Sequence, residues 1–282
     1  MSIADIHETF DYGYDPAVAE DFPLVPVPKP ATSPPPQWNV TSSFLPPVGK
    51  QTTPSCFVWS TTYGCVTFAA ARYNKCAPTL PAGQASPVYT YIKVQEQQNV
   101  PSGTCSGGVM SWPLQYLRLN GGTASMATAP AGQACSDAWT SWGSATTSPN
   151  AQFQPLEWSG VSLTGSAGLD NMRAIIFGNT PIAYGTWLYT DFPPYAGTPS
   201  PYVGNGTWLI NKTTGKKAGH CMMIIGYDDT MEAVLIQNSF GTSWGTQWNG
   251  SGGYVWMSYT TFQATMQGGG LYITKMQSGA NP

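Results

Sequence analysis

The apolar positions of the chain fall into segments with helical spacing and into short runs typical of buried strands. Residues 56–71 carry apolar and small side chains at intervals that predict a buried helix. Pro54 and Ser55 directly precede this segment and are typical of a helix start. Two apolar runs, 221–225 and 234–236, predict buried strands.

A proline-dense stretch, residues 23–36, separates an acidic N-terminus from the rest of the chain. Because proline fixes φ and lacks an N–H, this stretch predicts an extended linker, and we place the start of the folded body near Gln37. The preceding residues contain six acidic side chains and no Lys or Arg. Residues 1–36 are therefore either a solvated, disordered tail or a functional segment, namely a remnant of a pro-segment or a strap over the body.

The chain has few charges, and this excludes several classes of protein. Charged residues make up 9% of the sequence, against about 25% in an average soluble domain. No apolar run reaches the length of about 18 residues that a membrane span needs, so we expect no membrane span. The 11 Lys and Arg residues form no basic stripe, so we expect no nucleic-acid partner.

The uncharged polar residues that remain for the surface indicate a secreted, extracellular protein, and one suited to acid, because such a surface changes little as carboxylates protonate. The start of the chain has no basic region and no apolar region of a signal peptide. We therefore expect that a signal was removed, with a cytoplasmic protein as the alternative.

The six cysteines are Cys56, Cys65, Cys76, Cys105, Cys135 and Cys221. No C-x-x-C pair occurs and only two histidines are present, so we expect no zinc or other metal site. If Cys56 stays reduced, two disulfides and one buried thiol are an economical arrangement of the rest. Cys105–Cys135 is the first candidate pair. Cys65–Cys76 is weaker, because one continuous helix would separate these thiols by roughly 16 Å.

Cys56 stands in the first turn of the predicted helix, a position that favours reactivity. The unpaired N–H groups and the dipole of a helix N-terminus stabilise a thiolate. The backbone N–H of Cys56 is also available to bind an oxyanion. A single cysteine in such a place is otherwise an inert core residue, so the interpretation depends on a matching base.

A thiol nucleophile needs a base, and the base needs a third group that fixes its tautomer. His7 lies in the acidic tail, whereas His220 stands at the mouth of the strand predicted at 221–225. Asn238 follows the second strand, and its amide oxygen can accept a hydrogen bond from one imidazole nitrogen. Taken singly, His220 is also compatible with a structural role, and Asn238 with a turn.

Three segments together resemble the papain-like cysteine peptidases. Cys56-Phe57-Val58-Trp59-Ser60 is similar to the family's nucleophile segment, with two aromatic residues exchanged. GHCMMIIGYDD and QNSFGTSWGTQWNGSGGYVWM resemble its histidine and asparagine motifs. The resemblance implies a nucleophile at Cys56, a base at His220, an orienting amide at Asn238 and an oxyanion donor at Gln51. Gln51 is separated from Cys56 by four residues, where the family usually has five.

The same resemblance implies a set of substrate-binding residues. CSGGVMSWPLQYLRLNGG is similar to the family's glycine segment, along which an extended peptide pairs with the backbone. PIAYG at 181–185 resembles the strand that lines the main specificity pocket. The small residues that line this pocket would leave room for an aromatic or branched side chain or for proline. The implied substrate-binding residues are Gly107, Gly108, Gly185, Cys221, Phe240 and Trp244.

The fold that the resemblance implies is α+β, with two lobes and the active-site cleft between them. A helical lobe takes about residues 50–155 and a β-barrel-like lobe about 156–275, within a peptidase domain of residues 37–282. Residues 86–95 resemble the family's short helix, and long loops are expected near 120–155 and 190–217. The implied activity is that of a cysteine endopeptidase, a monomer without cofactor, acting on peptides or proteins.

Other functions remain open at the level of sequence. The short turn after Gln51 and the phenylalanine at 240 are compatible with an inactive, peptide-binding relative. A papain-like transpeptidase or ligase forms the same acyl-enzyme and passes it to an amine. The many aromatic residues are also compatible with a carbohydrate-binding protein, although carboxylates for sugar hydrolysis are scarce. The carboxylates in question are Asp170, Asp191, Asp228 and Asp229.

Overall fold

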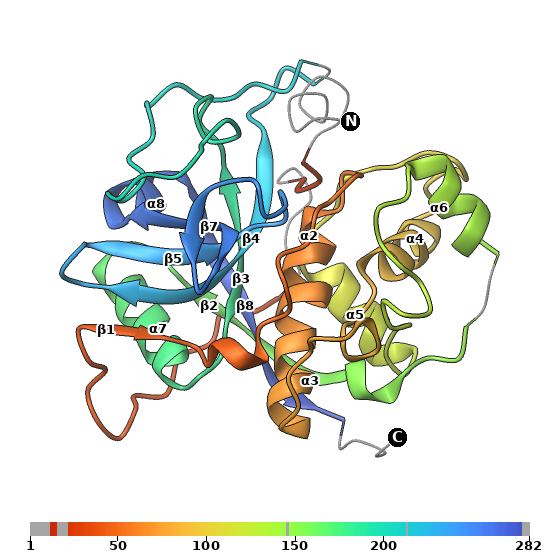
Figure 1. Cartoon of the computed structure of the whole chain (residues 1–282), viewed down its shortest axis with the longest axis horizontal. Coiled ribbons are helices and arrows are strands. Elements are labelled where there is room, and N and C mark those ends of the chain that lie inside the picture. Colours follow the sequence, from red (N-terminus) through yellow and green to blue (C-terminus); the bar gives the residue numbers. More distant parts are fainter. Residues whose placement is uncertain (1–11, 16–21, 145–146, 213, 278–282) are drawn as a thin grey trace.

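The computed structural model describes residues 12–15, 22–144, 147–212 and 214–277. A lobe of helices and a lobe built on an antiparallel sheet lie side by side, and one long helix stands where they meet (Figure 1). The division agrees with the expected α+β class, with helices gathered in the first half of the chain and strands in the second. His7 lies outside the described residues.

The central helix begins at Cys56, as the apolar spacing predicts. It consists of α2 (Cys56–Val58), a π-helical segment η2 (Trp59–Val66) and α3 (Thr67–Asn74), one after another without a break. Every residue of the first two parts is buried. The helix ends where Lys75 adopts a left-handed conformation with φ 52°, a common way to terminate a helix.

The rest of the helical lobe packs around this central helix. Its remaining elements are η1 (Ser42–Phe44), η3 (Pro81–Gly83), α4 (Pro87–Gln97), α5 (Ser111–Leu119), α6 (Cys135–Trp142) and η4 (Ala151–Phe153). α4 corresponds to the helix expected at 86–95, and the Ser86 hydroxyl caps it by accepting from the N–H of Tyr89. The stretch 120–155, expected as loop, contains α6 and η4.

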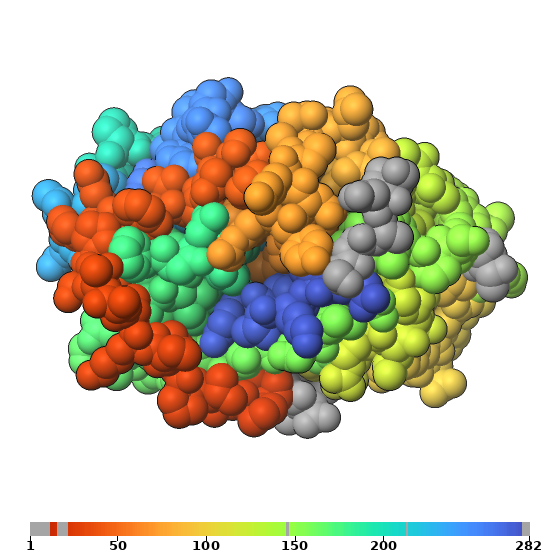
Figure 2. Space-filling model, turned by 90° about the horizontal axis from the view of Figure 1, so that it is seen from below, coloured from red at the N-terminus to blue at the C-terminus, as the bar shows by residue number. Residues whose placement is uncertain are grey.

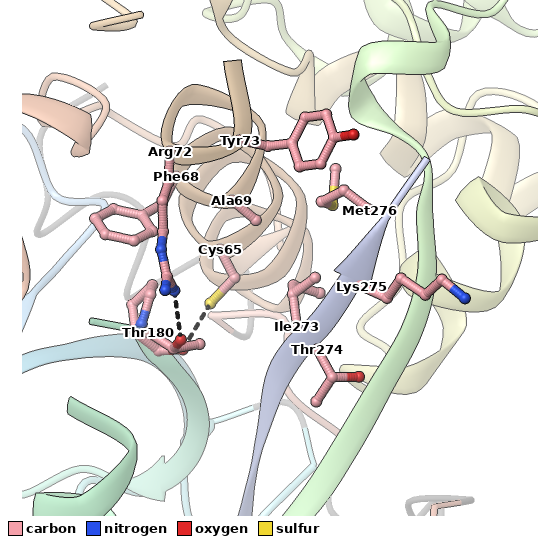
Figure 3. A pocket seen from close by; sticks show the side chains of 11 residues that line it. Cys65, Phe68, Ala69, Arg72, Tyr73, Thr180, Ile273, Thr274, Lys275 and Met276 are labelled. Atoms are coloured by element: carbon pink, nitrogen blue, oxygen red, sulfur yellow. Dashed lines mark hydrogen bonds between the residues drawn. The ribbon is translucent and has the colours of Figure 1, made fainter. Parts of the chain in front are cut away.

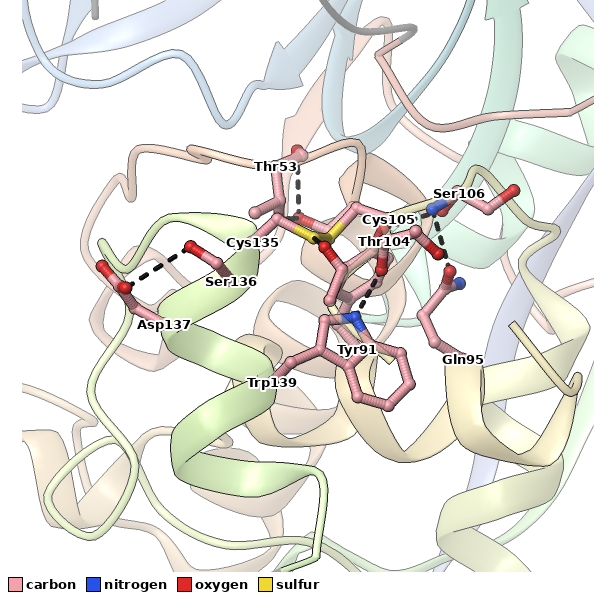
Figure 4. The surroundings of a disulfide bond; sticks show 12 residues. Thr53, Tyr91, Gln95, Thr104, Cys105, Ser106, Cys135, Ser136, Asp137 and Trp139 are labelled. Carbon is pink, nitrogen blue, oxygen red and sulfur yellow. Dashed lines mark hydrogen bonds between the residues drawn. A yellow bond between two sulfur atoms is a disulfide. The ribbon is translucent and has the colours of Figure 1, made fainter. Parts of the chain in front are cut away.

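One disulfide ties this lobe together. Cys105, before α5, is bonded to Cys135 at the start of α6, and the Trp139 indole N–H donates to the Thr104 carbonyl beside it (Figure 4). The candidate pair Cys65–Cys76 was wrong, and so was the arrangement with two disulfides. Cys65 is a buried thiol and Cys76 an exposed one, because the helix continues through Asn74 and carries them apart.

The second lobe is an open antiparallel sheet. The strands are β1 (Gln37–Asn39), β2 (Pro155–Ser162), β3 (Ile182–Trp187), β4 (Gly219–Asp228), β5 (Ala233–Gln237), β6 (Thr246–Trp248), β7 (Ser251–Ser258) and β8 (Met266–Met276). Their order is β2-β8-β3-β4-β5-β7-β6, with β1 paired to β4. The two predicted apolar runs lie in β4 and β5. Two helices, α7 (Gly165–Phe177) and α8 (Tyr259–Thr265), complete the lobe.

The proline-dense stretch is attached to the β lobe. The Val25 N–H donates to the Gly160 carbonyl at 3.0 Å, the Tyr227 hydroxyl to the Pro35 carbonyl at 2.8 Å, and the Asp229 N–H to the Pro36 carbonyl at 2.8 Å. Figure 2 shows this N-terminal part running along the surface of the lobe. β1 begins at Gln37, where the folded body was expected to start.

None of the helices in the described part of the chain combines the length and the apolar character that a membrane crossing needs.

Candidate active site

Cys56 lies at the first position of the central helix, directly after Ser55 at the N-cap. Its side chain is fully buried. Its backbone N–H belongs to the first turn, so no helical carbonyl accepts it. The N–H donates instead to the carbonyl oxygen of Tyr12, at 3.3 Å. The position thus offers a sulfur atom and an N–H donor next to each other.

His220 lies on β4 opposite the start of the helix and is held by Asn238. Nε2 of His220 is 2.7 Å from Oδ1 of Asn238, and both side chains are buried. The Phe240 ring stacks on the imidazole, with 4.8 Å between ring centroids. Since Asn238 takes Nε2, Nδ1 is the nitrogen left for Cys56.

The surroundings of Cys56 favour the thiolate. The N–H of Cys221 donates to the Cys56 sulfur at 3.3 Å. Burial raises the pKa of the Cys56 thiol. Hydrogen bonds lower it, namely those from the side chain and the N–H of Cys221 and from His220, and so does the charge of His220. Together they outweigh burial, and the pKa falls to about 6. At neutral pH the sulfur is therefore a thiolate, which is the nucleophilic form of cysteine.

The side-chain amide of Gln51 is directed at the same point as the Cys56 N–H. Nε2 of Gln51 donates to the Tyr12 carbonyl oxygen at 3.2 Å and to the Thr53 carbonyl at 3.3 Å. Ser239 fixes which way the amide faces, because its hydroxyl donates to Oε1 of Gln51 at 2.6 Å. Two N–H donors beside the sulfur therefore converge on one carbonyl oxygen, the geometry of an oxyanion hole.

The peptide that fills this site is the N-terminal segment, residues 12–15. The Gly108 N–H donates to the Gly13 carbonyl at 2.7 Å, and the Asp15 N–H donates to the Gly108 carbonyl at 3.0 Å, in a parallel bridge. A Cβ atom at Gly107 would come within 2.9 Å of the Gly13 carbonyl oxygen. Gly108 therefore pairs with a peptide backbone that belongs to the same chain.

Tyr14 occupies the space next to Gly185. Its side chain is buried, and a Cβ atom at Gly185 would come within 2.6 Å of the Tyr14 ring. Gly219 is equally close to the Tyr14 carbonyl oxygen, at 2.6 Å from an added Cβ. Cys221 is the residue opposite Gly185 in the ladder between β3 and β4. These small residues leave room for one aromatic side chain.

Two aromatic rings pack against the imidazole of His220. Tyr12 packs against His220 at 5.3 Å and against Phe240 at 5.4 Å. Trp244 packs edge-on against Phe240 at 5.5 Å, and its indole N–H donates to the Phe192 and Pro193 carbonyls. Trp244 thus supports Phe240 from behind, whereas Phe240 contacts the imidazole itself.

The cavity drawn in Figure 3 lies elsewhere, between α3 and the end of β8. It has a volume of about 360 Å³, and Cys65, Arg72 and Met276 are among its lining residues. Cys65 is nine residues beyond Cys56, which places it roughly 13 Å further along the same helix. The described residues include no group of three or more His, Cys, Asp and Glu side chains placed to hold a metal ion.

The sequence left residues 1–36 open between a solvated tail and a functional segment, and it did not single out residues 12–15. Residues 12–14 lie buried in the cleft and Asp15 is half-buried, so this part of the tail is not a solvated one. The signal was the Tyr-Gly-Tyr sequence at 12–14, two aromatic residues around a glycine in an otherwise acidic stretch. Ser239 was missed because nothing in a sequence indicates that its hydroxyl reaches Gln51.

The comparison with protein families agrees with this geometry. The family model described as papain family cysteine protease matches residues 55–272. A search of curated protein sequences gives no match.

Solved structures of cysteine proteases have the same fold. Xylellain, a cysteine protease from Xylella fastidiosa, is 20% identical with a TM-score of 0.66, over 95% of this chain and 97% of its own. Procathepsin B S9 from Trypanosoma congolense is 14% identical with a TM-score of 0.66, over 98% and 90%. Digestive procathepsin L2 from the larval midgut of Tenebrio molitor is 18% identical with a TM-score of 0.67, over 96% and 80%.

Proposed function

Because the chain belongs to the papain family of cysteine proteases, which hydrolyse peptide bonds, we propose that it is an endopeptidase with Cys56, His220 and Asn238 as its catalytic residues. The observation that carries this proposal is the position of the Tyr12 carbonyl oxygen. It accepts from the Cys56 N–H and the Gln51 amide at 3.3 and 3.2 Å, next to the nucleophilic sulfur. A scissile carbonyl would occupy the same place.

The mechanism follows from these positions. The Cys56 thiolate attacks the carbonyl carbon, and the oxygen gains negative charge between the Cys56 N–H and the Gln51 amide. His220 gives a proton from Nδ1 to the departing amine, which leaves a thioester on Cys56. His220 then accepts a proton from water, which attacks the thioester and releases the acid. Asn238 keeps the imidazole in the required tautomer and orientation.

The N-terminal segment supports a latent form of the enzyme. The Tyr12 ring packs against His220, whereas the chain that follows the Tyr12 carbonyl turns to Gly108. Cleavage at the Tyr12 carbonyl would release the nitrogen of Gly13, a residue whose own carbonyl is bonded to Gly108. The segment therefore fills the oxyanion site and blocks substrates without being a good substrate itself.

The same segment indicates which substrates fit. Tyr14 fills the pocket at Gly185, and the residues around it are small and uncharged. We expect the enzyme to prefer an aromatic residue at the substrate position that enters this pocket. Equal cleavage of peptides with an aromatic and with a charged residue there would contradict this specificity.

A single substitution in the full chain tests the proposal. An alanine Cβ at position 13 would come within 2.1 Å of the Pro54 carbonyl oxygen, and Gly13 has a φ of +107°. Since a left-handed backbone alone costs an L-residue about 1–2 kcal/mol, Gly13→Ala should release the segment. We expect peptidase activity on a fluorogenic peptide to rise at least about tenfold.

The matched control is Gly206→Ala, where φ is +75° but nothing lies within 4 Å of an added Cβ. It should leave activity unchanged, and Cys56→Ala in the Gly13→Ala chain should abolish it. If iodoacetamide alkylates Cys56 in Gly13→Ala but no peptide is cut, the protein is a peptide-binding relative. If an added amine nucleophile appears in the products by mass spectrometry, it is a transpeptidase.

We also propose that the protein is secreted and acts as a monomer on peptide or protein substrates. The Cys105–Cys135 disulfide supports an oxidising location.

A further inference from the structure

A second cysteine stands next to the nucleophile. Cys221 follows His220 on β4, and its backbone nitrogen is 3.3 Å from the Cys56 sulfur. The side chain of Cys221 also forms a hydrogen bond with the Cys56 thiol, so the two sulfur atoms face each other, as the formation of a disulfide requires. Both cysteines are buried, with 0% and 1% of their surface exposed.

The other two thiols have no such neighbour. Cys65 is buried with the Pro181 carbonyl 3.9 Å from its sulfur, and Cys76 is exposed after the end of α3. Neither faces a second cysteine among the hydrogen bonds described for it. The chain therefore places one thiol pair at the point where a thiolate forms, and it contains two further thiols that serve as internal standards.

We propose that Cys221 is a resolving thiol that protects the nucleophile by forming a reversible disulfide with it when a hydroperoxide oxidises Cys56. The Cys56 thiolate attacks hydrogen peroxide, an S–O bond forms, the O–O bond breaks and hydroxide leaves, which gives a sulfenic acid. The Cys221 sulfur then attacks the Cys56 sulfur, so that an S–S bond forms and the S–O bond breaks. Its proton and the departing hydroxide become water. Two thiols and one peroxide thus give one disulfide and two waters.

The disulfide prevents permanent loss of the nucleophile. A sulfenic acid without a nearby thiol is oxidised further to sulfinic acid, which ordinary reductants do not reverse. A disulfide returns to two thiols with a dithiol reductant. The inference uses the reactive thiolate of the proposed function but not peptide cleavage, so a thiol map tests it whether or not the protein cuts peptides.

The Gly13→Ala chain, in which the cleft is opened, is the protein for the experiment. It is treated with hydrogen peroxide at pH 7, remaining thiols are blocked with N-ethylmaleimide, and non-reduced peptides are mapped by mass spectrometry. We expect a crosslinked peptide pair of Cys56 and Cys221, lighter by two hydrogen atoms, before the exposed Cys76 is oxidised. Dithiothreitol should restore both thiols.

Cys221→Ala in the same chain removes the resolving thiol. Cys56 should then gain two oxygen atoms, and the fraction of Cys56 thiol that dithiothreitol restores should fall roughly tenfold. Cys65→Ala is the matched control, because it removes a buried thiol from the same helix as Cys56, and the disulfide should still form.

Two results would overturn the inference, and both are read in the chain that retains Cys221, so a folding defect of Cys221→Ala does not affect them. One is a sulfinic acid at Cys56 together with a Cys221 thiol that N-ethylmaleimide still labels. The other is a pair of unmodified thiols at a peroxide concentration that oxidises Cys76.

Discussion

Cys56 and Cys65 are both buried thiols on the same helix, yet their surroundings make them chemically opposite. The pKa of Cys56 is lowered to about 6, whereas burial raises the pKa of Cys65 to about 12. Burial by itself acts in the same direction on both, because it disfavours the charged form. The difference must therefore come from the groups that face each sulfur.

At Cys56 those groups are donors from the other lobe, namely the Cys221 N–H and His220. At Cys65 one hydrogen bond from the backbone of Ala183 only partly offsets burial, and the Pro181 carbonyl accepts from the thiol. The nearby Arg72 already donates to the Asn179 carbonyl. It also donates to the Thr180 hydroxyl, as Figure 3 shows. In this helix, the buried cysteine that is a nucleophile is the one whose sulfur faces hydrogen-bond donors.

His220→Ala is the substitution expected to reduce the difference in reactivity between Cys56 and Cys65 most. It removes the imidazole that lowers the pKa of Cys56 and protonates the leaving amine. In the Gly13→Ala chain we expect kcat/KM for a fluorogenic peptide to fall roughly 10⁴-fold, and alkylation of Cys56 at neutral pH to slow. Circular dichroism melting is the control for folding. Activity within tenfold of the parent would assign the base to another residue.

The pH dependence of alkylation measures the contrast directly. Iodoacetamide reacts with the thiolate, so labelling of Cys56 in Gly13→Ala should be half-maximal near pH 6, the lowered pKa of this thiol. Below that midpoint the rate should fall about tenfold per pH unit. Cys65 should stay unlabelled throughout the range in which the protein is folded. If the labelling of Cys56 were half-maximal near the pKa of an ordinary thiol, the hydrogen-bond donors around its sulfur would not lower its pKa.

Cys65→Ala should have the smallest effect, because it changes packing and not chemistry. We expect the free energy of unfolding to decrease by about 1 kcal/mol, as for the loss of a small buried group. Cys76→Ala, at an exposed position, should leave it nearly unchanged. Peptidase activity and the alkylation rate of Cys56 should stay the same in both variants, and a loss of activity in Cys65→Ala would connect the cavity of Figure 3 to the active site.

Much of the fold was predictable because its signals are local. The apolar spacing from residue 56 and the runs at 221–225 and 234–236 correspond to the central helix, β4 and β5. The pair Cys105–Cys135 was also expected correctly. The π-helical segment was not predictable, since an added residue in a buried helix depends on the contacts that surround it.

The candidate site was predictable in its members and not in its geometry. Motifs pointed to Cys56 and His220, whereas the direction of the Gln51 amide depends on Ser239, a residue 188 positions away. The position of residues 12–15 was equally out of reach. The tail as a whole is acidic, and the burial of Tyr12, Gly13 and Tyr14 depends on glycines at 107, 185 and 219 that leave room for them.

The sequence by itself determined where the helices and strands form, which residue types carry the chemistry, and the order in which they occur. Side-chain periodicity and turn residues act over a few neighbouring positions, and a sequence displays them openly. Only the tertiary structure decided which buried cysteine is a nucleophile, which peptide fills the cleft and which thiol stands next to Cys56. Each of these depends on groups from distant parts of the chain meeting within hydrogen-bond distance.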